Sequence, residues 1–242
     1  MADSRKVAIV TGASRGLGAV IARVLAERGH DLVIGARGAE ALREVAESLR
    51  QRGGAVVTVE GDITDAPVRE RLVDAARGLG GLDVLVNNAS ELGGIGPLAT
   101  VDLQRWVGAL RVNAGAPLVL IQLALPLLAE RHGLIVNISS DAAHAAYPGW
   151  GPYGSSKAAL ELMTRTLAAE LRPGQIGAVI VDPGDMRTRM HQEAFAGEDI
   201  SDRPLPDVTV PFWSWLFDQQ PLDISGERFV AQKAAMPWLQ PV

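Results

Sequence analysis

The stretch VAIVTGASRGLG, residues 7–18, decides the fold of this 242-residue chain. Residues 7–10 form a short apolar, mostly β-branched run that predicts a strand, and residues 11–18 are rich in glycine. Residues 19–28 then carry apolar side chains at helical spacing and stop before Gly29, so they predict a helix. This order is typical of a nucleotide site, because glycine lets the backbone approach a pyrophosphate whose charge the helix N-terminus favours.

The same alternation of strands and helices continues along the chain. Apolar runs predict strands at residues 31–35, 55–60, 84–86, 134–138 and 177–181. Helical patterns lie between them, at residues 39–52, 66–77, within 102–132 and from about 154 to 171. Short apolar strands separated by helices indicate a parallel sheet covered on both faces. We therefore predict an α/β fold, a single domain over residues 1–242 with a doubly wound, Rossmann-like parallel sheet.

Residues 187–211 break this pattern. They carry Pro204, Pro206 and Pro211 with mixed charges, and they show little periodicity. We predict a lid-like excursion over the ligand crevice, since open α/β sheets bind ligands beyond the carboxyl ends of their strands. The alternative is an ordinary surface loop.

Composition and charge narrow the function classes. The formal net charge is -5, the wrong sign for attraction to nucleic acid or to an anionic lipid surface. There is no cysteine, which excludes disulfides, thiolate nucleophiles and thiolate zinc sites. The most apolar run, residues 118–128, is too short to span a bilayer, and residues 1–6 are polar, unlike a signal peptide. We expect a cytoplasmic protein without nucleic-acid or membrane partners.

The end of the second predicted strand bears on which dinucleotide binds. An NAD enzyme places a carboxylate there on the ribose 2′-hydroxyl, whereas Gly35, Ala36 and Arg37 offer none. Arg37, with Arg15 in the turn, suits a 2′-phosphate in charge and geometry. NADP(H) is therefore favoured over NAD(H). The alternative is that both arginines are solvated surface residues.

Tyr153 and Lys157 are four residues apart on a predicted helix, so both project from one face. An ammonium beside a phenol lowers the tyrosine pKa toward working pH and makes the tyrosine a usable acid or base. Such a pair is usually an ordinary helix face. Here, however, Ser139 and Ser140 end the strand at residues 134–138, at the sheet edge where ligands bind, and this conjunction indicates a catalytic site.

The motifs resemble those of the short-chain dehydrogenase/reductase family, in the family's order and over nearly the whole chain. The matching segments are TGASRGLG (11–18), Asp62, NNAS (87–90), Asn113 in RVNAGAP, NISS (137–140), YGSSK (153–157) and DPGDMRT (182–188). Together they are far more specific than any one of them. The chain departs from the family motif at one position, because the family's usual NNAG ends here in Ser90. This serine is expected to alter the cofactor pocket or the loop at residues 91–96.

The resemblance implies a catalytic role for four residues. Ser140 would hydrogen-bond the substrate oxygen, and Tyr153 would give or take its proton. Lys157 would lower the tyrosine pKa and hold the nicotinamide ribose, while Asn113 would anchor a water in the proton relay.

The resemblance also implies a cofactor site and an assembly. NADP(H) would be cradled by Gly12, Ser14, Arg15, Gly16, Leu17 and Gly18, and its 2′-phosphate would be bound by Arg37. The adenine would contact Asp62 and Ile63, and the ribose region would be lined by Asn87 and Ala89. The nicotinamide would be bordered by Pro183, Gly184 and Thr188. A homotetramer or homodimer would form on the helix that carries Tyr153 and on the helix before it. Residues 222–231 resemble the family's closing turn and last strand.

The remaining histidines and aromatic residues are assigned by position. The four histidines lack the mutual spacing and the carboxylates of a metal site, so no metal is expected. His30 and His132 are predicted to lie at the surface or in loops. Five residues in loops near the crevice are candidates for substrate contact: His144, Tyr147, Trp150, Met190 and His191. The aromatic cluster after the excursion is predicted to pack in the core or between subunits, and it consists of Phe212, Trp213, Trp215, Leu216 and Phe217.

These observations favour an NADP(H)-dependent oxidoreductase that moves a hydride between nicotinamide and a carbonyl or alcohol. The small-molecule substrate would be a ketoacyl thioester, a ketosteroid or a small ketone, and loop sequence does not choose among them. One alternative is a regulatory sensor that binds NADP(H) without turnover. A sugar-nucleotide epimerase or dehydratase would need a larger C-terminal substrate domain.

Overall fold

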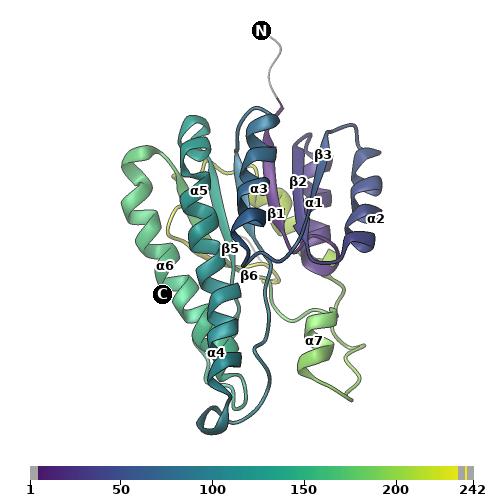
Figure 1. Cartoon of the computed structure of the whole chain (residues 1–242), viewed down its shortest axis with the longest axis vertical. Coiled ribbons are helices and arrows are strands. Elements are labelled where there is room, and N and C mark those ends of the chain that lie inside the picture. The colour runs from purple at the N-terminus through teal and green to yellow at the C-terminus, as the bar shows by residue number, and fades with distance from the viewer. Residues whose placement is uncertain (1–4, 234–237, 239–242) are drawn as a thin grey trace.

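The fold is built on one seven-stranded sheet, seen in a computed structural model that describes residues 5–233 and 238 (Figure 1). All strands run parallel, in the order β3-β2-β1-β4-β5-β6-β7. The strands are β1 (Val7–Thr11), β2 (Asp31–Ala36), β3 (Val56–Glu60), β4 (Val84–Asn87), β5 (Leu134–Ile138), β6 (Gly177–Asp182) and β7 (Arg228–Val230). The predicted doubly wound parallel sheet is confirmed.

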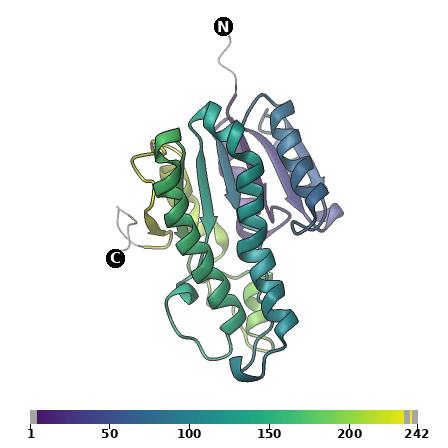
Figure 2. The same cartoon turned by 60° about the vertical axis from the view of Figure 1, so that its left-hand side comes forward.

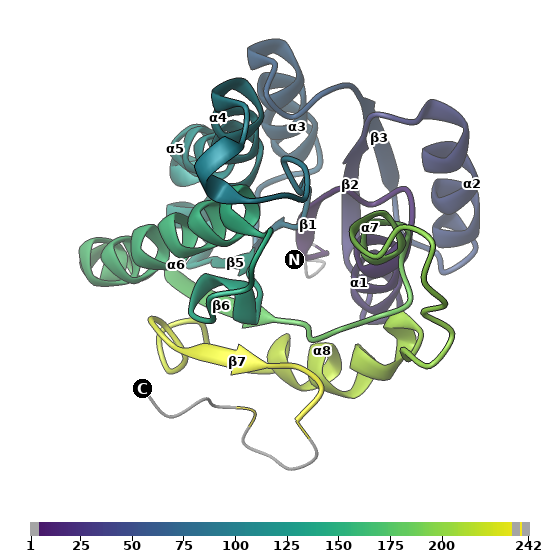
Figure 3. The same ribbon diagram turned by 90° about the horizontal axis from the view of Figure 1, so that it is seen from below.

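Helices cover both faces of the sheet, as the view onto the carboxyl ends of the strands shows (Figure 3). One face carries α1 (Gly16–Glu27), α2 (Ala39–Arg50) and α8 (Val210–Leu216). The other carries α3 (Ala66–Gly78), α5 (Ala116–Arg131) and α6 (Gly151–Leu171). Side chains of β1 alternate between the two cores, since Ala8 and Val10 join the first and Val7 and Ile9 the second.

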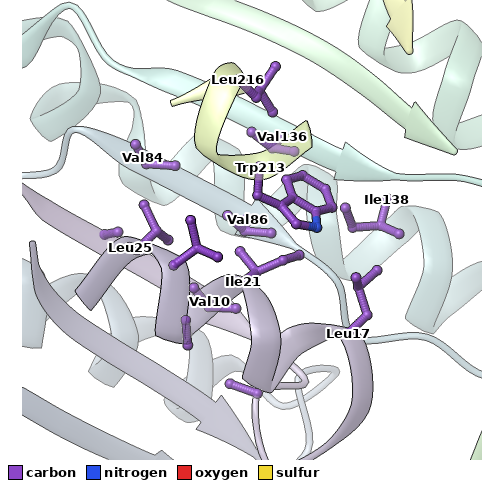
Figure 4. Close-up of a cluster of buried hydrophobic side chains, with 14 of the residues drawn as sticks. Val10, Leu17, Ile21, Leu25, Val84, Val86, Val136, Ile138, Trp213 and Leu216 are labelled. Carbon is purple, nitrogen blue, oxygen red and sulfur yellow. The ribbon is translucent and has the colours of Figure 1, made fainter. Parts of the chain in front are cut away.

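The predicted aromatic cluster belongs to the first core. Phe212, Trp213 and Leu216 of α8 are fully buried. Trp213 lies between Ile21 of α1 and the strand residues Val86, Val136 and Ile138 (Figure 4). Its indole nitrogen donates to Thr209 Oγ1 at 2.8 Å, so the ring is buried without an unpaired donor. The core-packing prediction is confirmed for this cluster.

A long helical stretch, residues 103–131, runs along one side of the molecule (Figure 2). It consists of α4 (Leu103–Leu110), a π-helical turn (Arg111–Gly115) and α5. Its length and apolar composition would suffice to cross a membrane, and 44% of its most apolar window is buried inside the protein. That buried share packs against α3 and the sheet, so core packing accounts for part of its apolar character. π-helical turns often occur at functional sites, and this one carries Asn113.

The excursion at residues 187–211 is more regular than its weak periodicity suggests. It contains the six-residue helix α7 (Arg189–Ala194), a 3₁₀ turn (Pro206–Thr209) and the start of α8. The Thr188 hydroxyl accepts a hydrogen bond from His191 N at 3.2 Å and so caps α7. Helix α7 lies beyond the carboxyl ends of the strands (Figures 1 and 3).

His30 was predicted to lie at the surface or in a loop. It lies in the connection between α1 and β2, but it is buried there, with only 5% of it exposed. Gly29, at φ +81°, turns the chain from α1 into β2, and His30 Nδ1 lies 3.1 Å from Leu25 O. Burial lowers the pKa of His30. The exposed His132 fits its prediction.

Candidate active site

A cleft of about 1400 Å³ opens at the carboxyl ends of the strands. The glycine-rich turn, the ends of β2, β4 and β5, helix α6 and the excursion all contribute to its wall. Most of the predicted site residues line it: Gly12, Ser14, Arg15, Gly16, Leu17, Gly18, Arg37, Asp62, Ile63, Ala89, Ser140, Tyr153, Lys157, Pro183, Gly184 and Thr188. Asn87 and Asn113, also predicted, lie beneath this wall. The fold therefore brings one predicted set of residues to one cleft.

The glycine-rich turn leaves no space for side chains at two positions. A Cβ added to Gly12 would lie 2.9 Å from Ala89 Cα, and one added to Gly18 would lie 2.4 Å from Gly12 O. Gly12 also has φ +67°, a conformation that other residues rarely adopt. Helix α1 begins at Gly16, and the residue before it provides no side-chain cap. Its first N–H groups thus suit the phosphates of a dinucleotide.

Asn88 holds this turn in place, and sequence analysis missed its role. Its side-chain nitrogen donates to Thr11 O at 2.9 Å and to Gly12 O at 3.2 Å. The preceding Asn87, predicted to line the ribose region, is buried and donates instead to Asn137 Oδ1 at 2.8 Å. The signal was available, because Asn88 directly follows the strand that pairs with β1.

The far end of the cleft carries both predicted arginines. A Cβ on Gly38 would lie 3.9 Å from Arg15 Nη2, so that guanidinium lies beside the residue that follows Arg37. Burial alone would raise the pKa of Asp62, but hydrogen bonds from Thr64 and the positive charge of Arg37 outweigh it and lower that pKa. Two cations and a carboxylate therefore surround the position expected for the adenosine end of a dinucleotide.

Three predicted catalytic side chains meet at the other end of the cleft. Ser140 follows β5, while Tyr153 and Lys157 lie in the first turns of α6. Ser140 and Ser90 line the same cleft as Tyr153, and their hydroxyls act to lower the pKa of its phenol. Lys157 is 2% exposed, lies 5.4 Å from the centre of the Tyr153 ring, and donates to Ile138 O at 2.7 Å.

The pKa of Tyr153 departs from the sequence-based expectation. A neighbouring ammonium was expected to lower it, but burial and the negative charge of Asp182 raise it, against the smaller effects of the two serine hydroxyls. Desolvation penalises a buried phenolate more than these contacts stabilise it. Tyr153 therefore keeps its proton at neutral pH, as a proton donor must. Burial also lowers the pKa of Lys157 to about 7, while the charge of Glu161 opposes that shift.

The Asn113 side chain is fully engaged inside the protein. Its Oδ1 accepts hydrogen bonds from Ser90 Oγ and from Glu91 N, both at 2.9 Å. Its Nδ2 donates to Glu91 O and to Ser156 Oγ, both at 2.8 Å. An amide group has two donor hydrogens and two acceptor sites, so none is left for the water expected there. The side chain instead positions the loop that begins at Ser90.

A buried ionic network lies directly behind the predicted catalytic residues, and sequence analysis missed it. Glu161 is 1% exposed and accepts from Ser139 Oγ at 2.7 Å and from Arg228 Nε at 2.9 Å. His144 Nε2 lies 2.6 Å from its other oxygen. Arg228 also donates to Asp182 Oδ2 at 3.1 Å. The signal was the helical spacing, because Glu161 lies one turn beyond Lys157 on the same face of α6.

Aromatic rings line the cleft beside Tyr153. Trp150 lies 5.8 Å from Tyr153 and 5.9 Å from Phe195, measured between ring centres. The five residues predicted as candidates for substrate contact, His144, Tyr147, Trp150, Met190 and His191, all line the cleft. Among the described residues, no group of three or more His, Asp or Glu side chains is placed to hold a metal ion.

Comparisons with known proteins agree with this geometry. A family model described as short chain dehydrogenase matches residues 6–199. An uncharacterized oxidoreductase of Saccharomyces cerevisiae is 39% identical over 188 residues, covering 76% of this chain and 72% of its own. Dehydrogenase/reductase SDR family member 4 of Homo sapiens is 36% identical over 187 residues, covering 76% and 67%. A short chain dehydrogenase from Shigella flexneri, complexed with NADP, superposes with a TM-score of 0.88 at 29% identity, covering 94% and 97%.

Proposed function

The chain belongs to the short-chain dehydrogenase/reductase family of oxidoreductases, and from this premise we propose that it reduces a carbonyl with NADPH or oxidises the matching alcohol with NADP. The observation that carries the proposal is the meeting of Ser140, Tyr153 and Lys157 at one end of a cleft whose middle is lined by the glycine-rich turn. The substrate is a small carbonyl compound or alcohol.

Each catalytic side chain has a distinct task in the reductive direction. NADPH held by the glycine-rich turn would supply the hydride for the carbonyl carbon. Tyr153, held protonated by burial, gives its proton to the carbonyl oxygen as negative charge develops there. The Ser140 hydroxyl, which donates to Asp141 Oδ1 at 3.0 Å in the structure, turns to donate a hydrogen bond to the same oxygen and stabilises that charge. The Lys157 ammonium, close to the ring, stabilises the phenolate that Tyr153 becomes.

The preference for NADP(H) rests on Arg15 and Arg37. Both line the cleft, the Arg15 guanidinium lies beside Gly38, which follows Arg37, and the end of β2 bears no carboxylate that would repel a 2′-phosphate. The Shigella relative with NADP bound is consistent with this preference.

Nicotinamide fluorescence on titration with NADPH and then NADH tests the cofactor, and a panel of ketones and ketoacyl thioesters tests turnover. We expect tighter binding of NADPH and consumption of it with at least one carbonyl. In Arg37→Ser the NADPH affinity should fall about tenfold, the effect of one charge-assisted hydrogen bond, with NADH unaffected. Arg43→Ser, on the exposed face of α2, is the matched control. Tight binding without turnover would favour a sensor, and tighter binding of NADH would contradict the NADP(H) assignment.

Self-association is the second part of the proposal. Helices α5 and α6 expose the apolar side chains of Val119, Leu123 and Leu162, the last with 66% of its surface exposed. We expect a homodimer or homotetramer through these helices, because isolated apolar side chains on neighbouring helices gain from mutual burial. Light scattering on the wild type and on Leu162→Glu tests this, and a monomeric wild type would contradict it.

A further inference from the structure

Arg228 is a buried cation that contacts three segments of the candidate active site. It begins β7, the strand at one edge of the sheet and the neighbour of β6 (Figure 3). Only 7% of the residue is exposed. Burying a charge is costly unless the charge is paired and hydrogen-bonded, so the partners of Arg228 show what it holds in place.

The Arg228 guanidinium donates a hydrogen bond to each of these three segments. Its Nε donates to Glu161 Oε1 at 2.9 Å, on α6, one turn beyond Lys157. Its Nη2 donates to Asp182 Oδ2 at 3.1 Å, at the end of β6, and to Ser140 O at 3.2 Å, just after β5. Because the guanidinium is planar and rigid, these bonds fix α6 and the ends of two neighbouring strands relative to one another.

The Asp182 carboxylate extends this arrangement to the loop that follows β6. Its Oδ1 accepts from Gly184 N at 2.9 Å, while its Oδ2 accepts from Arg228. Pro183 and Gly184 line the cleft, at the positions expected to border the nicotinamide. A shift of the Arg228 guanidinium would therefore move this loop and the backbone of Ser140 relative to α6.

We propose that Arg228 is a positioning residue of this enzyme, which holds the loop after β6 and Ser140 in register with Tyr153 on α6. The inference rests on the proposed function, because it concerns the alignment of nicotinamide, substrate oxygen and phenol. Lysine at this position would keep the positive charge between the buried Glu161 and Asp182. It has a single nitrogen, however, and cannot reproduce contacts made from two nitrogens of a planar fork.

The test compares the binding of NADPH with that of adenosine 2′,5′-bisphosphate, which has the adenosine end and the 2′-phosphate but no nicotinamide. In Arg228→Lys, NADPH affinity should fall about tenfold, the effect of one hydrogen bond to a charged group. Affinity for adenosine 2′,5′-bisphosphate should stay at the wild-type value, because its site lies at the other end of the cleft. With a carbonyl substrate, kcat should fall about tenfold to a hundredfold, since a misplacement of about 1 Å can cost a hundredfold.

The matched control is Arg165→Lys. Arg165 Nη2 also lies 3.2 Å from a Glu161 oxygen, but 41% of its side chain is exposed. This variant should bind both ligands as the wild type does. A second variant, Asp182→Asn, weakens the same connection from its other side. It keeps the size of the side chain and an oxygen for Gly184 N, and it leaves Arg228 paired with Glu161. We expect the same selective loss of NADPH affinity.

The outcomes separate this inference from the proposed function. Wild-type NADPH affinity in Arg228→Lys, or an equal loss of affinity for both ligands, would overturn the role of Arg228 and leave the proposed function intact. If Arg228→Lys does not fold, wild-type NADPH affinity in Asp182→Asn would overturn it. A wild-type protein that does not bind NADPH would contradict the proposed function, and the inference would fall with it.

Discussion

The glycine-rich turn and the catalytic face of α6 lie on the same cleft but are built in different ways. The turn depends on the lack of side chains at Gly12 and Gly18, because backbone atoms approach each other there more closely than any side chain would permit. The α6 face depends on side chains that come from segments far apart in the sequence, such as Glu161 and Arg228, which pair across 67 residues. The glycines of the first come from one contiguous stretch, which Asn88 then holds in place, whereas the second exists only once the sheet has formed.

Tyr153→Phe separates the two regions most sharply. Loss of the phenolic proton should lower turnover by about 10²–10⁴-fold, the usual contribution of a general acid. Cofactor affinity should hardly change, because the glycine-rich turn is untouched. Steady-state rates and a fluorescence titration on the same preparation check both statements. Full activity would remove Tyr153 from the mechanism.

Gly18→Ala breaks the backbone region instead. The new methyl group would lie 2.4 Å from Gly12 O, and such overpacking typically costs about 1–3 kcal/mol. NADPH affinity should therefore fall roughly tenfold to a hundredfold. The control is Gly78→Ala at the end of α3, where an added Cβ meets nothing within 4 Å. Equal NADPH affinities in the two variants would contradict the role given to the turn.

Glu161→Gln alters the side-chain region through charge alone. The negative charge of Glu161 raises the pKa of Lys157, which burial lowers to about 7. Removing that charge lowers the Lys157 pKa further. Turnover needs the cationic form of Lys157, so its alkaline fall should begin at lower pH in this variant. The exposed Glu170→Gln on the same helix is the control, and coincident pH profiles for the two variants would refute the coupling.

His30 gives the smallest effect, far from the cleft. Burial lowers its pKa below the ordinary value of 6.5, so the unfolded chain binds the proton more readily than the folded one. Its contribution to stability is therefore full above pH 6.5 and is lost as pH falls through the folded-state pKa. Thermal melts of His30→Gln should show a smaller loss of Tm on acidification than the wild type. The control is the exposed His132→Asn, which should lose Tm as the wild type does.

The sequence could predict the features that are encoded locally, but not those that depend on contacts between distant segments. Strand and helix positions were predicted within a few residues, because short apolar strands and helical periodicity are local signals. The cleft-lining glycines were found for the same reason. The Glu161 and Arg228 pair, the burial of His30 and the raised pKa of Tyr153 were not, since each depends on what the fold packs around a side chain. The structure also shows the Ser90 hydroxyl donating to Asn113 Oδ1 at 2.9 Å, where the sequence marked only a departure from the family motif.

The central claim is that hydride passes between nicotinamide and substrate in this cleft, and isotope transfer tests it most directly. NADPH would carry deuterium at the transferable C4 position, prepared in each of its two stereochemical forms, and would be incubated with the protein and a carbonyl panel. The account predicts that one form delivers its deuterium to the carbonyl carbon of an alcohol product, as read by mass spectrometry. NADPH that binds tightly while no product acquires deuterium from either form would contradict it.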